Sequence, residues 1–151
     1  MKSTKAEITL LLAGLDEAFD RSSWHGPNLK STTKGLTVEA ALWRPAPGRH
    51  NVWELLVHAA FWKYAARRRL TGDRTLKFAH PGKNFFPCPE SPTDAALLAE
   101  ISLLVSEHRQ LRETVAAMKE FTPRVLRMIR GVAAHDIYHA GQIQLLKRLQ
   151  T

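Results

Sequence analysis

Residues 135–149, HDIYHAGQIQLLKRL, decide the fold because they combine a helical hydrophobic pattern with two histidines one turn apart. Apolar residues in and before this stretch recur at alternating steps of three and four, which is the spacing of one face of an α-helix. The stripe consists of Val125, Met128, Val132, His135, His139, Gln142, Leu146 and Leu149. Burying polar rings is unfavourable unless they have partners, and imidazoles four residues apart can bind one metal ion. The stretch therefore predicts a buried helix that supplies two metal ligands, His135 and His139.

A third histidine has the same kind of position in an earlier segment. His58 falls on a second helical stripe, together with Leu55, Trp62 and Ala65. The four-residue spacing alone is weak evidence, because a chain with seven histidines produces such pairs by chance. Three histidines on buried stripes are more informative, since one shared metal ion would explain all of them.

Several residues near these histidines are candidates for supporting roles, and the sequence leaves their alternatives open. Glu54, one turn before His58, could be a general base, a fourth ligand or an orienting carboxylate, or only an exposed cap glutamate at a helix N-terminus. Gln142 could bind a ligand or a water molecule, or it could fix the helix register. Further candidates near the site, each with an open structural or solvent-facing alternative, are Tyr138, Asp136, Trp24 and His25.

Two other reactive side chains are predicted to lie outside the chemistry. His108 falls on a buried stripe of its own, where we favour a hydrogen-bonded core histidine over a fourth ligand. Cys88 is the single cysteine, so it cannot form an internal disulfide, and it lies between prolines in a predicted loop. Nothing in the sequence around Cys88 indicates a base or a lowered thiol pKa, so a non-catalytic role is favoured.

Helical periodicity extends over most of the chain, and no strand pattern competes with it. The predicted segments are long helices at 4–21, 51–70, 93–119 and from 123 onward, with a short helix at 37–43. Only residues 120–122 separate the last two helices, which predicts antiparallel neighbours, whereas the two earlier connections are long enough to cross a bundle. The connection 72–92 is predicted to pack through its phenylalanines and is a candidate lid. The predicted fold is a single all-α domain over 1–151, a four-helix bundle with long crossover connections.

The chain carries a net charge of +8, and its densest basic cluster is the run of arginines at 67–69. These arginines close a predicted helix, where cations favour the negative end of the helix dipole. A solvated helix end is therefore favoured over a nucleic-acid surface, because no interleaved aromatic residues accompany the arginines. No apolar run approaches the roughly 20 residues that span a bilayer. The N-terminal segment also lacks the features of an export signal, so a cytoplasmic protein is predicted.

The order and spacing of several motifs resemble one known family. Glu54 precedes His58 by four residues, a long middle section follows, and the last helix contains H-x-x-x-H-x-G-Q-[IL] from His135 onward. The approach RPAPGRHNVWELLVHAAFW and the tetrapeptide WHGP are similar to one branch of the same group. Over nearly its whole length the chain resembles the DinB/YfiT-like superfamily of metal-dependent proteins.

The resemblance implies a four-helix bundle that holds one divalent metal ion, typically zinc or nickel, through His58, His135 and His139. It also implies an open coordination position for water or substrate. Some members of the family are transferases or isomerases that use a small thiol such as mycothiol or bacillithiol, and homodimers are common among them. A small-molecule substrate, a low-molecular-weight thiol and a second copy of the chain are therefore the expected partners.

Three functional hypotheses follow. The leading one is a metal-dependent enzyme, a thiol-dependent S-transferase or isomerase with a three-histidine site. The first alternative is a metal-dependent hydrolase that uses metal-bound hydroxide, with Glu54 as base. The second is a non-catalytic, DNA-damage-related interaction module that uses its basic surface.

Overall fold

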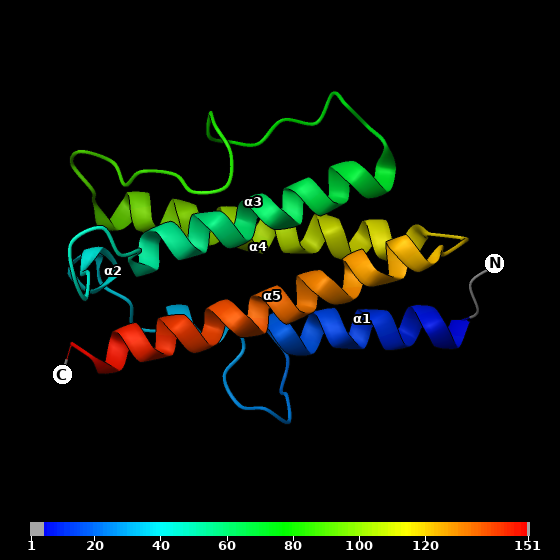
Figure 1. The fold of residues 1–151 in the computed structure, drawn as a ribbon, viewed down its shortest axis with the longest axis horizontal. Helices are drawn as coiled ribbons and strands as arrows, with labels where there is room; N and C mark the ends of the chain where they lie inside the picture. The colour runs from blue at the N-terminus through cyan, green and yellow to red at the C-terminus, as the bar shows by residue number, and fades with distance from the viewer. Residues whose placement is uncertain (1–4, 151) are drawn as a thin grey trace.

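The computed structural model describes residues 5–150, in which five α-helices and one short 3₁₀ helix form (Figure 1). In chain order they are α1 (Lys5–Phe19), η1 (Lys30–Thr33), α2 (Val38–Leu42), α3 (Val52–Thr71), α4 (Asp94–Ala117) and α5 (Pro123–Arg148). No β-strand occurs in this part of the chain, and none of its helices has the length and apolar character needed to cross a membrane. The predicted all-α fold is confirmed, with α1, α3, α4 and α5 as the long helices.

Local sequence signals set the helix ends within two residues of the predicted positions. Asn51 and Glu54 form a capping box at the start of α3, in which each side chain accepts a backbone N–H of the other residue. A threonine side chain caps each of α4 and α5. Gly72 ends α3 in the left-handed conformation, with φ of 70°. Thr4, the predicted start of the first helix, lies outside the described residues.

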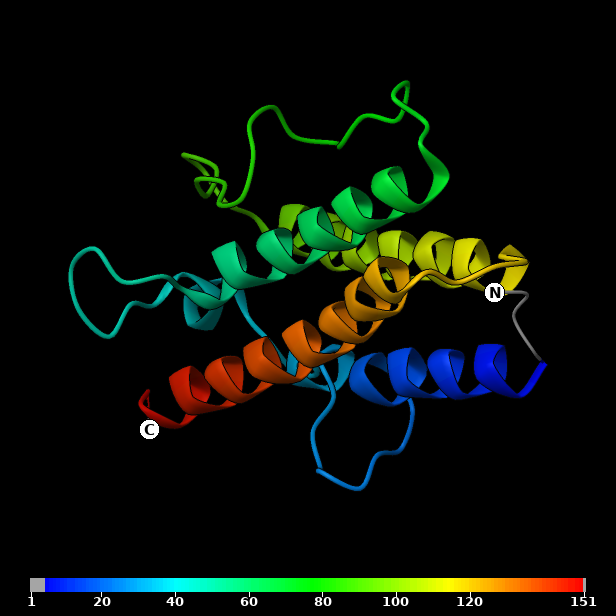
Figure 2. The same cartoon turned by 45° about the vertical axis from the view of Figure 1, so that its right-hand side comes forward.

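The long helices pack with α3 against α4 and α5, and with α1 against α4 and α5. The helices α3 and α4 run in one direction, and α1 and α5 run in the other (Figures 1 and 2). The last two helices, α4 and α5, are antiparallel as predicted. The prediction that they are neighbours is wrong, because they lie diagonally opposite each other in the bundle. Residues 118–122 can extend over roughly 17 Å, which is enough for a diagonal when neighbouring axes are about 8–10 Å apart.

The connection between α3 and α4 has to return along the length of the bundle, because these helices run in the same direction. It follows the outer side of α3 (Figure 1). Three phenylalanines anchor it to the core clusters: Phe78, Phe85 and Phe86. The predicted crossover and its aromatic packing are confirmed.

The buried face of α5 is displaced around the helix from the predicted stripe. Its buried residues are Ile129, Val132, Asp136, His139, Ala140, Ile143 and Leu146. Asp136, for which a solvent-facing position was an open alternative, is entirely buried, whereas His135 lies partly exposed at the edge of this face. Asp136 can be buried because Lys63 of α3, which is also completely buried, donates a hydrogen bond to its carboxylate. The periodicity of α5 cannot predict this burial, since the partner lies on another helix.

His108 belongs to the core, as the favoured interpretation holds. Its ring stacks on Phe19 with 3.8 Å between ring centroids, and its Nδ1 lies 3.3 Å from Nζ of Lys63. Burial lowers the pKa of His108 to about 3, with help from the positive charge of Lys63. The ring is therefore neutral at physiological pH and acts as an acceptor beside the buried lysine.

Candidate metal centre

Two neighbouring helices bring the three predicted metal ligands together. His58 lies on α3, and His135 and His139 lie one turn apart on α5. Nε2 of His135 is 3.1 Å from Nε2 of His58 and 2.9 Å from Nε2 of His139. Two nitrogens bound to one tetrahedral ion at about 2.0–2.1 Å lie roughly 3.3 Å apart. Both distances are close to the spacing that a single shared ion requires, and one ligand nitrogen from each of the three rings lies within 4.8 Å of the other two.

Hydrogen bonds to the opposite ring nitrogens aim two of these imidazoles at a common point. Nδ1–H of His58 donates to the backbone carbonyl of Asn84 over 2.9 Å, and Nδ1–H of His139 donates to the side-chain carbonyl of Gln142 over 2.6 Å. Because a carbonyl oxygen can only accept, both neutral rings carry their proton on Nδ1 and have a lone pair on Nε2. A single proton on His135 cannot fully satisfy both facing lone pairs. A divalent cation can, so the donor set fits a metal ion.

Burial keeps all three imidazoles in the neutral form that binds metals. It lowers the pKa of His58, lowers that of His135 to about 3 and lowers that of His139 to about 4. The two neighbouring imidazoles further lower the pKa of His135. Because the rings are already neutral at neutral pH, binding of a metal ion requires no net loss of a proton from them.

The three histidines open into a cavity of about 650 Å³ between α3, α5 and the loop that precedes α3. The other lining residues are Pro45, Ala46, Arg49, His50, Leu55, Phe85, Tyr138, Gln142, Leu145 and Leu146. Most of them are apolar, and none is Asp, Glu or Cys. Within residues 5–150, no carboxylate or thiol joins the three histidines in a group close enough to share an ion.

The connection between α3 and α4 supplies two site residues that the sequence analysis missed. Asn84 has a φ of 72°, the one positive value at a non-glycine residue in the described chain, and its backbone carbonyl accepts the proton of His58. Its side chain accepts a hydrogen bond from Trp62 Nε1 over 3.1 Å. The Phe85 ring stacks on His58 at 4.1 Å and on His50 at 3.7 Å between centroids. The only available signal was that asparagine tolerates the left-handed conformation better than most residues.

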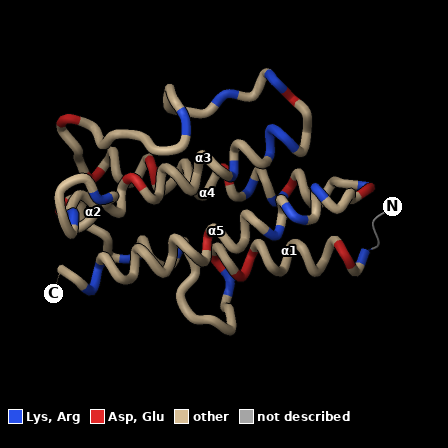
Figure 3. Tube along the Cα trace, in the orientation of Figure 1, with Lys and Arg blue, Asp and Glu red and all other residues tan. Residues whose placement is uncertain are grey.

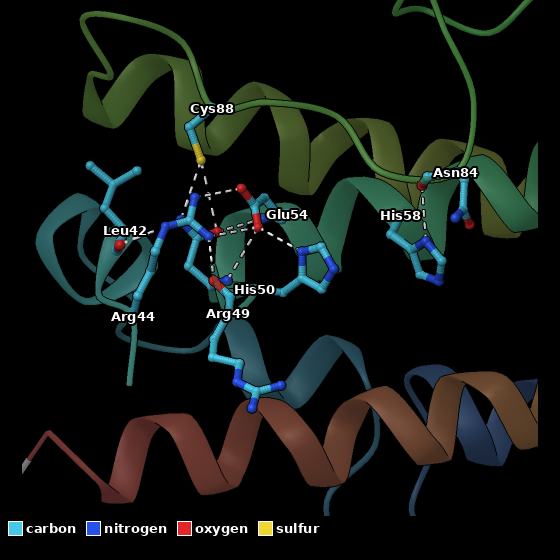
Figure 4. A network of polar contacts seen from close by, with 9 residues as sticks. Leu42, Arg44, Arg49, His50, Glu54, His58, Asn84 and Cys88 are labelled. Atoms are coloured by element: carbon cyan, nitrogen blue, oxygen red, sulfur yellow. Dashed lines mark hydrogen bonds and ion pairs between the residues drawn. The ribbon is translucent and has the colours of Figure 1, made fainter. Parts of the chain in front are cut away.

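Glu54 lies beside the cavity but not among the imidazoles. Its carboxylate accepts hydrogen bonds from both terminal nitrogens of Arg44, and one of its oxygens is 2.9 Å from Nδ1 of His50 (Figure 4). Burial alone would raise the pKa of Glu54, but the hydrogen bonds from Arg44 and His50 outweigh burial and hold the pKa below its ordinary value. Glu54 caps α3, as one of the alternatives held, but it is buried rather than exposed. The structure also gives His50, which had no predicted role, a place in the cavity wall.

The remaining candidates divide between the site and the opposite side of the bundle. Gln142 and Tyr138 both line the cavity, and Gln142 Nε2 donates to the Tyr138 hydroxyl over 3.2 Å. Trp24 is fully exposed, and His25 lines a separate pocket between α1 and α5. The structure therefore does not bring Trp24 and His25 to the mouth of the site, because the loop after α1 leaves the bundle on the α1 side (Figure 1).

The run of arginines at 67–69 does not form one surface, although basic residues gather near the end of α3 and in the connection that follows (Figure 3). Arg67 is buried and pairs with Glu107 at 3.0 Å. The guanidinium of Arg69 lies over the Trp62 ring, 5.6 Å from its centroid. A nucleic-acid surface built on this run would therefore lack Arg67.

Two other reactive groups show no sign of a site. Burial raises the pKa of the Cys88 thiol, which opposes formation of the reactive thiolate. A second cluster of ligand-type side chains contains Asp16, Asp20 and His108. The Asp16 carboxylate already accepts two hydrogen bonds from Arg112, at 2.7 and 2.9 Å. A cation there would have to displace an arginine that balances the same charge.

Comparison with known proteins agrees with this arrangement. A family model described as the DinB superfamily matches residues 21–143, a range that contains His58, His135 and His139. No curated protein and no solved structure matches the chain. The match confirms the family that the motifs indicated: the chain belongs to the DinB superfamily.

Proposed function

We propose that this protein is a divalent-metal-dependent enzyme that uses a low-molecular-weight thiol to act on a small molecule, as a transferase or an isomerase. The observation that carries the proposal is the convergence of three neutral imidazoles on one point in the wall of a cavity. The thiol and the reaction type come from the resemblance to the family, in which zinc and nickel are the typical ions. Imidazole ligands suit both of these metals.

The ligand set supports catalysis over a purely structural role. Structural zinc sites usually close with four protein ligands, whereas catalytic sites keep one position for water or substrate. Within the described residues, the group consists of three histidines only. A divalent ion bound there would supply a Lewis acid that lowers the pKa of a bound thiol or water.

The residues around the cavity would position the reactants and move a proton. The Glu54 carboxylate accepts from Nδ1–H of His50, which leaves Nε2 of His50 free to accept a proton from a thiol and return it to a product. Gln142 holds the His139 ring in its orientation. The apolar side chains of the wall, including Leu55 and Phe85, would limit the access of water to the reacting groups.

Hydrolysis is the second candidate, and it requires a different base from the one first considered. The hydrolase hypothesis gave this role to Glu54, whose oxygens are engaged by Arg44 and His50. A hydrolase would therefore have to use His50 to activate water. Ester and amide hydrolysis should be compared with thiol transfer on the same metal-loaded protein, because only one activity is expected to depend on added thiol. The homodimer stays a prediction that light scattering of the purified protein would test.

The metal is tested by elemental analysis of protein purified without an affinity tag. We expect about one divalent ion per chain in the wild type and in His25→Ala, a control whose histidine lies outside the site. His135→Ala should lose the ion while keeping its helical circular dichroism. Equal metal content in all three proteins would refute the site, and a metal-loaded protein without any thiol-dependent activity would refute the reaction class.

A further inference from the structure

We infer that the substrate of this cavity is a carboxylate-bearing small molecule, whose carboxylate is bound by Arg49 and whose apolar part lies against α5. The inference deepens the proposed function and rests on it, because it takes this cavity as the substrate site. Two features of the cavity support it: the unpaired guanidinium of Arg49, which is the only permanent charge in the lining, and the exposed apolar residues along the rim.

The lining of the cavity contains one permanent charge, and it is positive. Arg49 is the only permanently charged side chain in the lining, and the other ionisable side chains there are histidines and Tyr138. The carboxylate beside the cavity, that of Glu54, already faces Arg44 and His50. A cleft whose lining carries one arginine and no carboxylate attracts anions, and a bound divalent cation would strengthen this preference.

The guanidinium of Arg49 is available to a ligand. Its side chain extends from the loop before α3 toward α5, away from Glu54 (Figure 4). Arg49 contributes its backbone carbonyl to a hydrogen bond from Arg44, but its guanidinium has no hydrogen bond or ion pair within residues 5–150. A guanidinium binds a carboxylate through two parallel hydrogen bonds. A single such group matches a singly charged carboxylate better than a phosphate, which would call for further cations.

Apolar residues at the rim indicate the rest of the ligand. Leu145 is 58% exposed and Tyr138 is 62% exposed, although both line the cavity. Leu55, Phe85 and Leu146 continue the same apolar surface inward. Pockets of this kind bury the apolar body of a ligand and fix its orientation by a few polar groups.

The test compares matched acids and alcohols in two states of the protein. In metal-free protein, hexanoate and hexan-1-ol are titrated by NMR. In zinc-loaded protein, 6-mercaptohexanoate and 6-mercaptohexan-1-ol are titrated by calorimetry. We expect the acid to bind about tenfold more tightly than the alcohol in each pair, the effect of one charge-assisted contact. Arg49→Gln should remove this preference without changing the affinity for the alcohols, and Arg49→Lys should keep part of it. Arg130→Gln, which removes a positive charge at an exposed position outside the cavity, should leave the preference intact.

The measurements distinguish failure of the carboxylate assignment from failure of the proposed function. Equal affinities for acid and alcohol, an acid preference that survives Arg49→Gln, or an equal loss in Arg130→Gln would each overturn the carboxylate assignment. If the protein bound no zinc and neither thiol, the proposed function would fail. An acid preference in the metal-free protein would then still identify a carboxylate site.

Discussion

Replacing Lys63 by methionine is expected to destabilise the protein strongly, because the substitution leaves a carboxylate buried without a donor. The side chains of Lys63 and Asp136 are both 0% exposed. One oxygen of Asp136 accepts the hydrogen bond from Lys63, and the other has no hydrogen-bond partner. Asp136→Leu has the converse effect, since it leaves a buried ammonium group without its counter-charge.

The magnitude follows from the burial of the pair. Removing one partner of a buried ion pair lowers the free energy of unfolding by about 3–5 kcal/mol. At about 2.1 cal/mol/K per residue, this corresponds to a fall in Tm of roughly 10–15 °C. Burial also lowers the pKa of Lys63 and raises the pKa of Asp136, so the charges themselves are opposed by desolvation. The double variant Lys63→Met with Asp136→Leu should therefore return to within about 1–2 kcal/mol of the wild type.

Urea unfolding of the wild type, both single variants and the double variant measures this cycle. The pair also joins the two helices that carry the predicted metal ligands, because Lys63 lies on α3 with His58 and Asp136 follows His135 on α5. Metal affinity should therefore fall in the single variants and recover in the double variant. The reasoning would be refuted if each single variant lost less than about 1 kcal/mol of unfolding free energy, or if the two losses simply added in the double variant.

Three further predictions concern the site and its helices. Asn84→Gly should keep the hydrogen bond from His58 to the backbone carbonyl, because glycine tolerates the positive φ at this position. Asn84→Val should disturb this carbonyl, because a β-branched residue does not tolerate that φ. The valine variant should therefore bind the metal about 10–100-fold more weakly, as measured by competition with a chelator. The metal-free protein should lose stability as the pH falls from about 6.5 toward 3, because the unfolded chain binds a proton that buried His135, with its pKa of about 3, does not bind. His135→Gln should make this slope shallower in urea unfolding, and identical slopes would contradict the assignment. Gly131→Ala should raise the free energy of unfolding by about 0.5–1 kcal/mol, because an added Cβ meets no atom within 4 Å; a lower Tm in calorimetry would argue against it.

Much of the candidate site could be read from the sequence because its predicted ligands follow local and family patterns. His135 and His139 are one turn apart on any helix, and the motif around His58 indicated the third predicted ligand through the resemblance. Residues whose roles depend on distant partners were missed or misplaced. His50 stacks on the distant Phe85, and Trp24 lies away from the site. Neither position is encoded in helical periodicity, because both depend on the paths of loops.

The sequence by itself determined the helices of this protein, their ends and the three histidines. Those features depend on interactions within a few residues, such as the capping box of Asn51 with Glu54. Only the tertiary structure decided which helices are neighbours, which face of α5 is buried and how the rings are oriented. These outcomes depend on contacts between distant segments: Lys63 with Asp136, and the carbonyl of Asn84 with His58. The hydrophobic pattern of a helix reflects the sum of many contacts, so a sequence can predict it. The direction of the Nε2 lone pair of His58 depends on one hydrogen bond, that to the carbonyl of Asn84, and a sequence pattern does not contain it.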